Sequence, residues 1–394
     1  MTFDQTATIF LAVFVLTIGT ILIKRSPILQ KFCIPAPVVG GLLFAIIVTF
    51  LKYFNIVEIT VDTSLQSLFM ITFFTTVGLG ASFSLIKLGG KLLIIYWIAA
   101  GSIAVIQNVV GVSLAKVLGI EPLIGMMAGA VSMSGGHGGA AAYGQTVEGL
   151  GVSSALSIGA AAATLGLVAG GLIGGPVVKY LMTKYNLKPS ETELQNAKEV
   201  EEVKEEITTN NFFTQVLLIT FAMTVGSYIG AWFSEATGYA LPGYVGAMFA
   251  AVIVRNVVDR VAPNAINMRI VDLIGDITLG IFLSMALMSI KLWEIAELAL
   301  PLLIIVAIQV LIVVLFSIFI LFRVLGKNFD AAVMVSGFCG HTLGATPNAM
   351  ANMAAATSRF GPSRTAFLVV PIVGAFLIDV ISMPVIIVTI NMFT

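Results

Sequence analysis

Ten long apolar segments recur along the chain, each followed by a short polar or charged stretch. A helix needs about 20 mostly apolar residues to cross a bilayer, and each of these segments approaches or exceeds that length. The pattern predicts an all-α polytopic membrane protein. The predicted spans are residues 7–23, 34–54, 65–86, 92–118, 153–181, 212–234, 241–258, 270–290, 298–323 and 364–391.

Two further segments, 122–146 and 330–356, are apolar but are interrupted by Gly, Ser, Asn and Pro at their centres. The first contains the run Val131–Ala140, in which four of ten residues are glycine and two are serine. Hydrocarbon tolerates non-helical backbone only where protein buries it or where it lines a wet cavity. Both segments are therefore predicted to be broken or re-entrant hairpins that line a binding site.

The two halves of the chain share short motifs at an offset of about 200 residues. Ile106-Gln107 matches Ile308-Gln309, and Gly136-His137 matches Gly340-His341. Five spans in each half is an odd number, so the second half is predicted to be inverted relative to the first, a common plan of secondary transporters. The predicted domains are an N-terminal repeat at 1–181, a charged linker at 182–211 and a C-terminal inverted repeat at 212–394.

Charge predicts the orientation and excludes one class of partner. Only 10% of the residues are charged and 58% are hydrophobic, whereas soluble domains are about 25% charged. Lys+Arg and Asp+Glu number 20 each, so no basic excess indicates a nucleic-acid partner. Basic residues concentrate in alternate loops, and cytoplasmic loops carry such an excess. We therefore expect both termini outside and the linker in the cytoplasm. The first broken segment then enters from outside and the second from the cytoplasm.

Polar residues within the two broken segments are candidates for contacts with an ion and a substrate. The hydroxyl oxygens of Ser132 and Ser134, and carbonyl oxygens near the glycines, suit Na⁺ because it is a hard cation. In the second segment Thr346, Asn348 and Asn352 are polar, and Pro347 removes a backbone donor and frees a carbonyl upstream. Close helix packing by small residues, which is common in membranes, is the alternative.

Further polar residues lie inside apolar spans. A carboxylate at membrane depth is costly and indicates function, as for Asp379, although a protonated or serine-paired structural Asp is the alternative. Gln107 and Gln309 occupy matched positions and are expected to contact either the substrate or the hairpins. His137 and His341 could exchange protons near neutral pH, but a neutral hydrogen-bonding role is the simpler interpretation.

Several long motifs resemble those of the sodium/glutamate symporter family over nearly the whole chain. They include Ile34–Gly41, Ser134–Gly138, Gly170–Pro176, Leu343–Pro347 and Arg359–Pro371. The resemblance implies a sodium-driven importer of L-glutamate in a bacterial inner membrane, with a re-entrant loop between the fourth and fifth spans of each inverted repeat. It implies Na⁺ as the coupling ion, no organic cofactor, and lipid as the surroundings. Similarity to related transporters implies a homodimer with a static scaffold and an elevator-like transport domain.

The repeat and the resemblance together favour the residues at the two breaks as the site. The predicted substrate-binding residues are Ser134, Gly135, Gly136, His137, Gly138, Gln107, Gln309, Gly344, Thr346 and Asn348. The predicted sodium ligands are Ser132, Ser134, Thr346, Asn352 and Asp379.

One departure from the family pattern leaves the substrate open. The family's second loop usually reads Gly-His-Cys-Gly-Phe-Gly before Leu-Gly-Ala-Thr-Pro. Here Gly337–Thr342 has the histidine and phenylalanine exchanged and a threonine in place of the last glycine, and Asn348 stands where the family has threonine. A sodium- or proton-coupled carrier of another amino acid or organic anion is therefore an alternative. A channel, and an intramembrane serine hydrolase using Ser134 with His137 or His341, are two more.

Overall fold

The protein is nearly all helical, as predicted. The computed structural model describes residues 2–32, 34–189, 207–237, 241–262, 265–290 and 298–394. The strands among them are two short segments, β1 (Thr2–Phe3) and β2 (Thr60–Val61), which pair in parallel with Thr2 opposite Thr60. This pairing holds the N-terminus against the loop that follows the second span.

Eight helical stretches among the described residues are long and apolar enough to cross a membrane. They coincide with eight of the ten predicted spans. They are α1 (Gln5–Arg25), α3 (Ala36–Tyr53), residues Gly89–Val117 of α5 (Phe83–Val117), α8 (Ala155–Tyr185), α10 (Thr209–Thr237), α12 (Met268–Met288), the stretch Ala299–Val324, and the stretch Arg364–Phe393. The stretch Ala299–Val324 comprises α13 (Ala299–Phe316), the π-helical η4 (Ser317–Leu321) and α14 (Phe322–Val324), and the last stretch comprises α17 (Arg364–Ile372), the π-helical η5 (Val373–Leu377) and α18 (Ile378–Phe393).

The other two predicted spans are also helices, but each departs from a simple apolar span. Helix α4 (Gln66–Gly80) has 15 residues and is about 22 Å long, which is shorter than a typical hydrocarbon core. Helix α11 (Gly243–Val261) carries Arg255, Asp259 and Arg260 near its end. Most of the predicted linker, residues 190–206, lies outside the described residues.

Both interrupted segments contain a helix break. In the first, α6 (Pro122–Met126) and the π-helical η1 (Met127–Val131) end before α7 (Gly136–Gly149) begins. In the second, α15 (Phe329–Leu343) and α16 (Thr346–Phe360) are separated by Gly344 and Ala345. Helices α15 and α16 lie side by side, because Asn352 Nδ2 donates to the Ser336 carbonyl at 3.2 Å.

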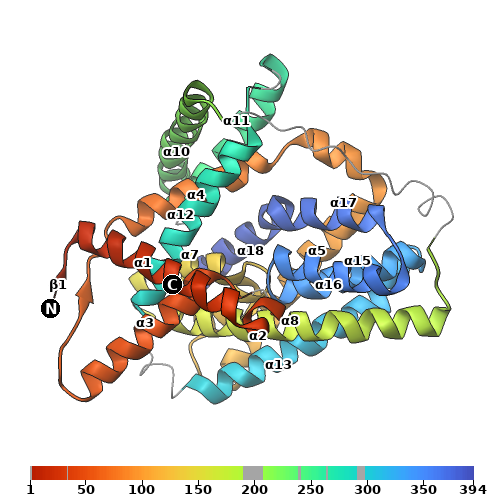
Figure 1. The fold of residues 1–394 in the computed structure, drawn as a ribbon, viewed down its shortest axis with the longest axis horizontal. Coiled ribbons are helices and arrows are strands. Elements are labelled where there is room, and N and C mark those ends of the chain that lie inside the picture. Colours follow the sequence, from red (N-terminus) through yellow and green to blue (C-terminus); the bar gives the residue numbers. More distant parts are fainter. Residues whose placement is uncertain (1, 33, 190–206, 238–240, 263–264, 291–297) are drawn as a thin grey trace.

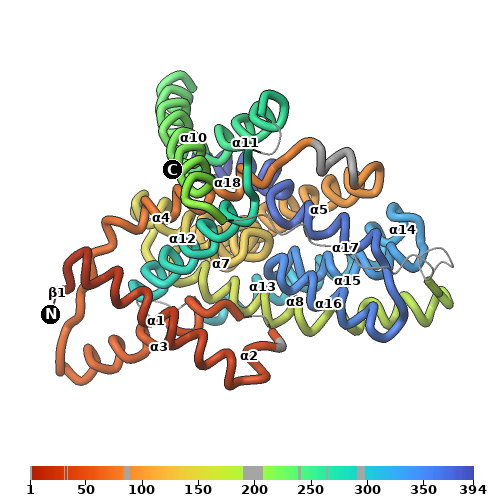
Figure 2. Tube along the Cα trace, turned by 45° about the horizontal axis from the view of Figure 1, so that its top comes forward, coloured from red at the N-terminus to blue at the C-terminus, as the bar shows by residue number. Residues whose placement is uncertain are grey.

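The helices form two bundles that occupy different parts of the molecule (Figures 1 and 2). The first bundle comprises α1, α3, α4, α10, α11 and α12, in which α12 packs against α1, α3 and α4, and α11 packs between α4 and α10. The second comprises the two broken segments with α5, α8, α13, α17 and α18. Each half of the chain contributes three helices to the first bundle. The two bundles meet where α12 and α4 face α7 and η5.

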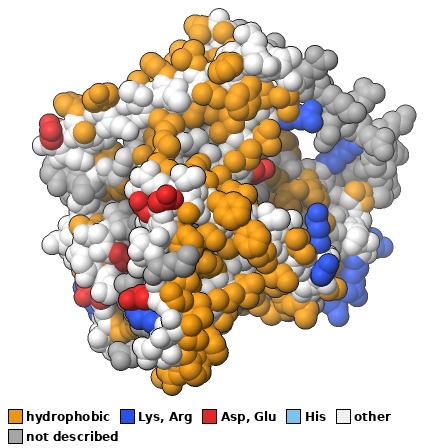
Figure 3. Space-filling view, turned by 60° about the vertical axis from the view of Figure 1, so that its left-hand side comes forward, with side chains coloured by type: hydrophobic (Ala, Val, Ile, Leu, Met, Phe, Trp, Pro, Cys, Tyr) orange, Lys and Arg blue, Asp and Glu red, His pale blue; other side chains and the backbone are white. Residues whose placement is uncertain are grey.

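The surface is strongly apolar, as a membrane environment requires. Figure 3 shows a broad band of hydrophobic side chains across one face, with most Lys and Arg toward one edge and most Asp and Glu toward the other. Helix α10 is the clearest case, since Phe213, Leu217 and Trp232 are each about two-thirds exposed. Such surface is stable in lipid and costly in water.

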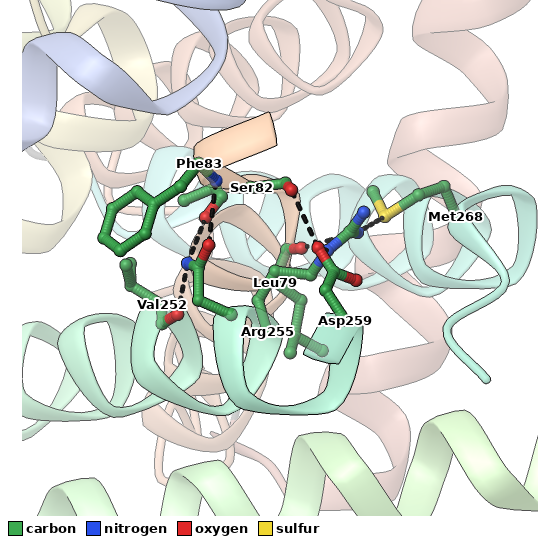
Figure 4. Close-up of polar contacts among 9 residues, drawn as sticks. Leu79, Ser82, Phe83, Val252, Arg255, Asp259 and Met268 are labelled. Carbon is green, nitrogen blue, oxygen red and sulfur yellow. Dashed lines mark hydrogen bonds and ion pairs between the residues drawn. The ribbon is translucent and has the colours of Figure 1, made fainter. Parts of the chain in front are cut away.

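The predicted span 65–86 is wrong at its end, because the helix stops at Gly80 and α5 begins at Phe83 (Figure 4). Side chains of α11 stabilise this junction. Arg255 Nη1 donates to the Leu79 carbonyl at 3.1 Å, and Asn256 Oδ1 accepts from the Phe83 amide at 2.8 Å. Both orphan ends, the last carbonyls of α4 and the first amide of α5, are therefore capped from a neighbouring helix.

Candidate functional site

A cavity of about 670 Å³ lies where the two bundles face each other. The first bundle contributes α1, the start of α3, α4 and α12 to its wall, and the second contributes both helix breaks, α7, η5 and α18. Its volume is in the range that holds small-molecule ligands. The cavity therefore joins segments that are about 200 residues apart in the sequence.

The two breaks touch each other at glycines. Gly136 has φ +58°, a left-handed conformation that favours glycine. A Cβ built on Gly136 would lie 2.8 Å from the Gly344 carbonyl oxygen. We call these two helix breaks the tips. No side chain fits between them, so glycine at position 136 permits their close approach.

Two helix N-termini open into the cavity. Helix α7 begins at Gly136 and α16 at Thr346, and neither has a side-chain cap hydrogen bond among the described residues. Gly135, His137 and Gly138 of the first tip and Ala345 and Thr346 of the second line the cavity. Uncapped N–H groups and the helix dipole attract anions. The cavity thus presents two anion-binding ends to one ligand.

Gln107 ties the two tips together from behind the cavity. Its Nε2 donates to the Thr342 carbonyl at 2.8 Å, and its Oε1 accepts from Ser134 Oγ at 2.7 Å. Gln309 Nε2 donates to the Gln107 carbonyl at 2.8 Å. Both glutamines are fully buried, and neither is among the residues that line the cavity. Of this group Ser134 alone reaches the cavity wall.

Three other predicted site residues lie behind the wall and bond to the protein itself. Asn348 Nδ2 donates to the Leu167 carbonyl at 2.7 Å, and Asn352 Nδ2 donates to the Gly170 carbonyl at 3.0 Å. The Ser132 hydroxyl lies 2.8 Å from the Gly159 carbonyl oxygen. All three bonds reach α8, so these residues attach the broken segments to that helix.

Oxygen atoms from four elements, α16, η5, α18 and α12, face the cavity. Thr346 Oγ1 donates to the Gly374 carbonyl at 2.9 Å, and both residues line the wall. Asp379, at the start of α18, and Asp276, on α12, add carboxylates from the two bundles. The described lining residues include these two carboxylates and no Lys or Arg. A cation is therefore favoured there electrostatically, beside the two anion-binding helix ends.

The two histidines differ in their partners. His137 Nε2 lies 3.0 Å from Thr164 Oγ1, whereas neither ring nitrogen of His341 has a hydrogen-bond partner among the described residues. Both line the cavity. Ser134 bonds to Gln107 and not to either histidine, so the described residues contain no Ser–His pair of the kind a serine hydrolase needs.

Three residues that line the cavity are not among the predicted site residues: His341, Asp276 and Tyr143. Signals were present for two of them. His341 is the second of only two histidines and lies three residues before the break at Gly344. Asp276 is an acidic residue inside the apolar helix α12. No comparable signal distinguishes Tyr143 from a core aromatic residue.

The chain is similar to known proteins over most of its length. The family model described as sodium/glutamate symporter matches residues 1–362. The sodium/glutamate symporter of Escherichia coli (strain K12) is 42% identical over 383 residues, covering 96% of this chain and 95% of that protein. The one from Haemophilus influenzae is 41% identical over 387 residues, covering 97% and 96%. A solved structure, the sodium proton antiporter MjNhaP1 from Methanocaldococcus jannaschii, covers 98% of this chain and 97% of its own at 15% identity and a TM-score of 0.47. The chain belongs to the sodium/glutamate symporter family, whose members are transporters and not enzymes.

Proposed function

We propose that the protein is a sodium-driven symporter that imports L-glutamate by alternating access and holds it at the two tips. One observation carries the proposal. Two uncapped helix N-termini, at Gly136 and Thr346, open into one cavity that also holds the carboxylates of Asp276 and Asp379. This arrangement matches a ligand with two carboxylates and one ammonium group. The names of the relatives, sodium/glutamate symporters, support the same assignment.

Glutamate is proposed to lie with one carboxylate at each helix end. The amides of α7 from Gly136 to Gly138 receive one carboxylate, and the Thr346 amide of α16 receives the other. The substrate ammonium then faces the carboxylate side of the cavity. The described lining residues include no Lys or Arg that would compete with the helix ends for either substrate carboxylate.

Sodium is proposed to bind next to the substrate through oxygens that reach the cavity. Of the predicted ligands, Ser134, Thr346 and Asp379 line the wall. Ser132 and Asn352 bond to α8, and we propose that they hold the broken segments in place. Each sodium ion that enters down a membrane potential of 100 mV releases about 2.3 kcal/mol, which drives uptake.

Access is proposed to alternate by movement of the second bundle against the first, as in an elevator. Both tips belong to the second bundle, so the substrate would travel with it. The chain passes between bundles at the α4–α5 junction and in the segments after α8 and α12. The first bundle then serves as the scaffold, and we propose that a homodimer forms through it.

The proposed orientation has both termini outside and the linker in the cytoplasm. Contacts between loops are consistent with this arrangement. Ser363 Oγ donates to Asp330 Oδ1 at 2.7 Å, so the start of α15 and the segment after α16 lie together, as a hairpin entering from one side requires. The ring of Tyr185 lies 5.0 Å from that of Phe322, which joins the end of α8 to the same side.

Uptake of labelled L-glutamate into proteoliposomes tests the proposal. We expect uptake against the glutamate gradient when sodium is high outside, and none when sodium is equal on both sides without a potential. Uptake that ignores sodium and follows a pH gradient would favour the alternative, a proton-coupled carrier. Unitary currents in a planar bilayer would contradict a carrier of either kind.

A further inference from the structure

His341 is a buried polar group whose hydrogen-bonding capacity is not used by the described part of the chain. Its side chain is 1% exposed, and neither Nδ1 nor Nε2 has a hydrogen-bond partner among the described residues. A buried polar group without a partner is unfavourable, and a ligand that supplies the partner recovers the lost interaction. Because His341 lines the cavity, a bound substrate is in position to supply it.

Two nearby side chains, by contrast with His341, have partners within the protein. His137 lines the same cavity, but its Nε2 lies 3.0 Å from Thr164 Oγ1. Phe338, three residues before His341 on α15, packs in the core with its ring centroid 5.5 Å from that of Tyr96 and 5.8 Å from that of Phe316. Helix α15 therefore places an aromatic ring in the core and an unbonded imidazole at the cavity.

The imidazole lies beside the anion-binding end of α16. A Cβ built on Gly374 would lie 2.7 Å from Thr346 Oγ1 and 3.3 Å from His341 Nε2. The hydroxyl and the imidazole nitrogen thus face the same small residue, at the first turn of α16. The start of α16 offers the Thr346 N–H, because Pro347 has no N–H and the Asn348 N–H bonds to the Ala345 carbonyl. His341 adds a side-chain donor next to the Thr346 amide.

We propose that His341 donates a hydrogen bond from Nε2 to the side-chain carboxylate of bound glutamate and so selects an acidic amino acid over its amide. This inference rests on the proposed function. A hydrogen bond to a carboxylate is roughly twice as strong as one to a neutral amide oxygen. The α7 end then takes the α-carboxylate, and α16 with His341 takes the side-chain carboxylate. Discrimination between glutamate and glutamine follows from the second contact.

The test measures inhibition of labelled glutamate uptake by unlabelled glutamate and by glutamine, in proteoliposomes with a fixed sodium gradient. His341→Phe should raise the inhibition constant for glutamate about 10- to 100-fold, because a hydrogen bond to a charged group is lost. The constant for glutamine should rise less, by about 2- to 10-fold, which is the value of a neutral hydrogen bond. Equal weakening of both ligands would overturn the proposal, since it would assign His341 to a group that they share.

Two more variants separate recognition from folding. His341→Gln keeps an N–H donor of similar reach and should stay within about tenfold of the wild type for glutamate. Phe338→Leu, on the same helix but away from the cavity, should leave the ratio of the two inhibition constants unchanged. If His341→Phe elutes as aggregate, His341→Met repeats the loss of the donor, and an unchanged ratio in that variant would also refute the proposal.

Failure of this inference differs from failure of the proposed function. A wild-type protein without sodium-dependent glutamate uptake would refute the function itself. Sodium-dependent uptake by the wild type, with an unaltered ratio in the His341 variants, would refute only the assignment of His341.

Discussion

Two polar regions of this apolar protein use their side chains in opposite ways. At the α4–α5 junction, the Arg255–Asp259 ion pair at 2.9 Å sits among protein partners (Figure 4). Ser82 Oγ donates to Asp259 Oδ2 at 2.7 Å, and Asn256 Nδ2 donates to the Ala81 carbonyl at 2.8 Å. We call Ser82, Arg255, Asn256 and Asp259 the junction cluster. In the cavity, by contrast, two helix ends lack side-chain caps and His341 lacks a partner among the described residues.

The contrast separates polar groups that stabilise the fold from those available to a ligand. Internal hydrogen bonds at membrane depth replace contacts that water supplies to a soluble protein. The junction cluster supplies its own contacts, so its loss should reduce stability. The polar groups of the cavity have hydrogen-bonding capacity that the described residues do not use. Loss of these groups should therefore reduce transport more than stability. This opposition is common where a binding site trades stability for function.

The largest effect is expected from filling the space between the two tips. Gly136→Ala puts a Cβ 2.8 Å from the Gly344 carbonyl oxygen at a residue with φ +58°. The tips must move apart, and a displacement of about 1 Å at a reacting or binding centre can cost roughly 100-fold in rate. We therefore expect sodium-driven glutamate uptake to fall about 100-fold or more.

Gly151→Ala is the matched control for that variant. Gly151 also has a left-handed backbone, with φ +94°, but a Cβ there meets nothing within 4 Å. Its cost is limited to backbone strain of about 1–2 kcal/mol, and uptake should remain within a few-fold of the wild type. Equal losses in the two variants would attribute the effect to strain and not to contact between the tips.

The next largest effect is expected at the carboxylate of Asp379 in the cavity wall. Asp379→Asn removes a negative charge from the cavity wall. If this charge stabilises Na⁺, the sodium concentration for half-maximal uptake should rise about tenfold or more, because a contact to a charged group contributes roughly 1.5–3 kcal/mol. Titration of glutamate uptake with sodium in proteoliposomes measures this half-maximal concentration.

Asp272→Asn serves as the control, since Asp272 lies one turn from Asp276 on α12 but is absent from the cavity wall. Its sodium dependence should match that of the wild type. A wild-type sodium dependence in Asp379→Asn would remove that residue from the proposed ion site, while leaving the substrate contacts at the helix ends intact.

The junction cluster should show the reverse behaviour. Arg255→Ala leaves Asp259 without its cation and the Leu79 carbonyl without its side-chain cap. Because both side chains are only partly exposed, we expect a loss of about 1–3 kcal/mol in stability, seen as a lower thermal midpoint in detergent. Arg260→Ala, on the exposed side of the same helix, should leave the midpoint unchanged. If Asp379→Asn lowered the thermal midpoint as much as Arg255→Ala does, the cavity and the junction cluster would not differ in their contribution to stability.

Local sequence patterns predicted the helices and both breaks, but not which polar groups reach the cavity. Hydropathy identifies an apolar segment and glycine identifies a break, and both signals are contained in a short stretch of chain. The direction in which a side chain points depends on the partner helix. Asn352 points at α8 because Gly174 leaves room there, with a Cβ on Gly174 only 2.2 Å from Asn352 Nδ2. That pairing joins residues about 180 positions apart and has no local signal.

The end of α4 was missed for a similar reason. Residues 65–86 are mostly apolar and contain no charged residue before Lys87, so hydropathy predicts an uninterrupted span. The helix stops at Gly80 because Arg255 and Asn256, from the other half of the chain, satisfy the backbone groups that the break exposes. The position of the break is therefore a property of the tertiary contacts.

The smallest effect is expected at an ion pair that lacks the surroundings of the junction cluster. Lys52 Nζ lies 3.3 Å from Glu58 Oε1, but the two side chains are 46% and 71% exposed. Solvent screens such a pair, and its contribution is usually below about 1 kcal/mol. Lys52→Gln should therefore shift the thermal midpoint by no more than about 2 °C. A shift as large as that of Arg255→Ala would mean that charge pairing alone, and not the capping of α4 and α5, accounts for the stability of the junction.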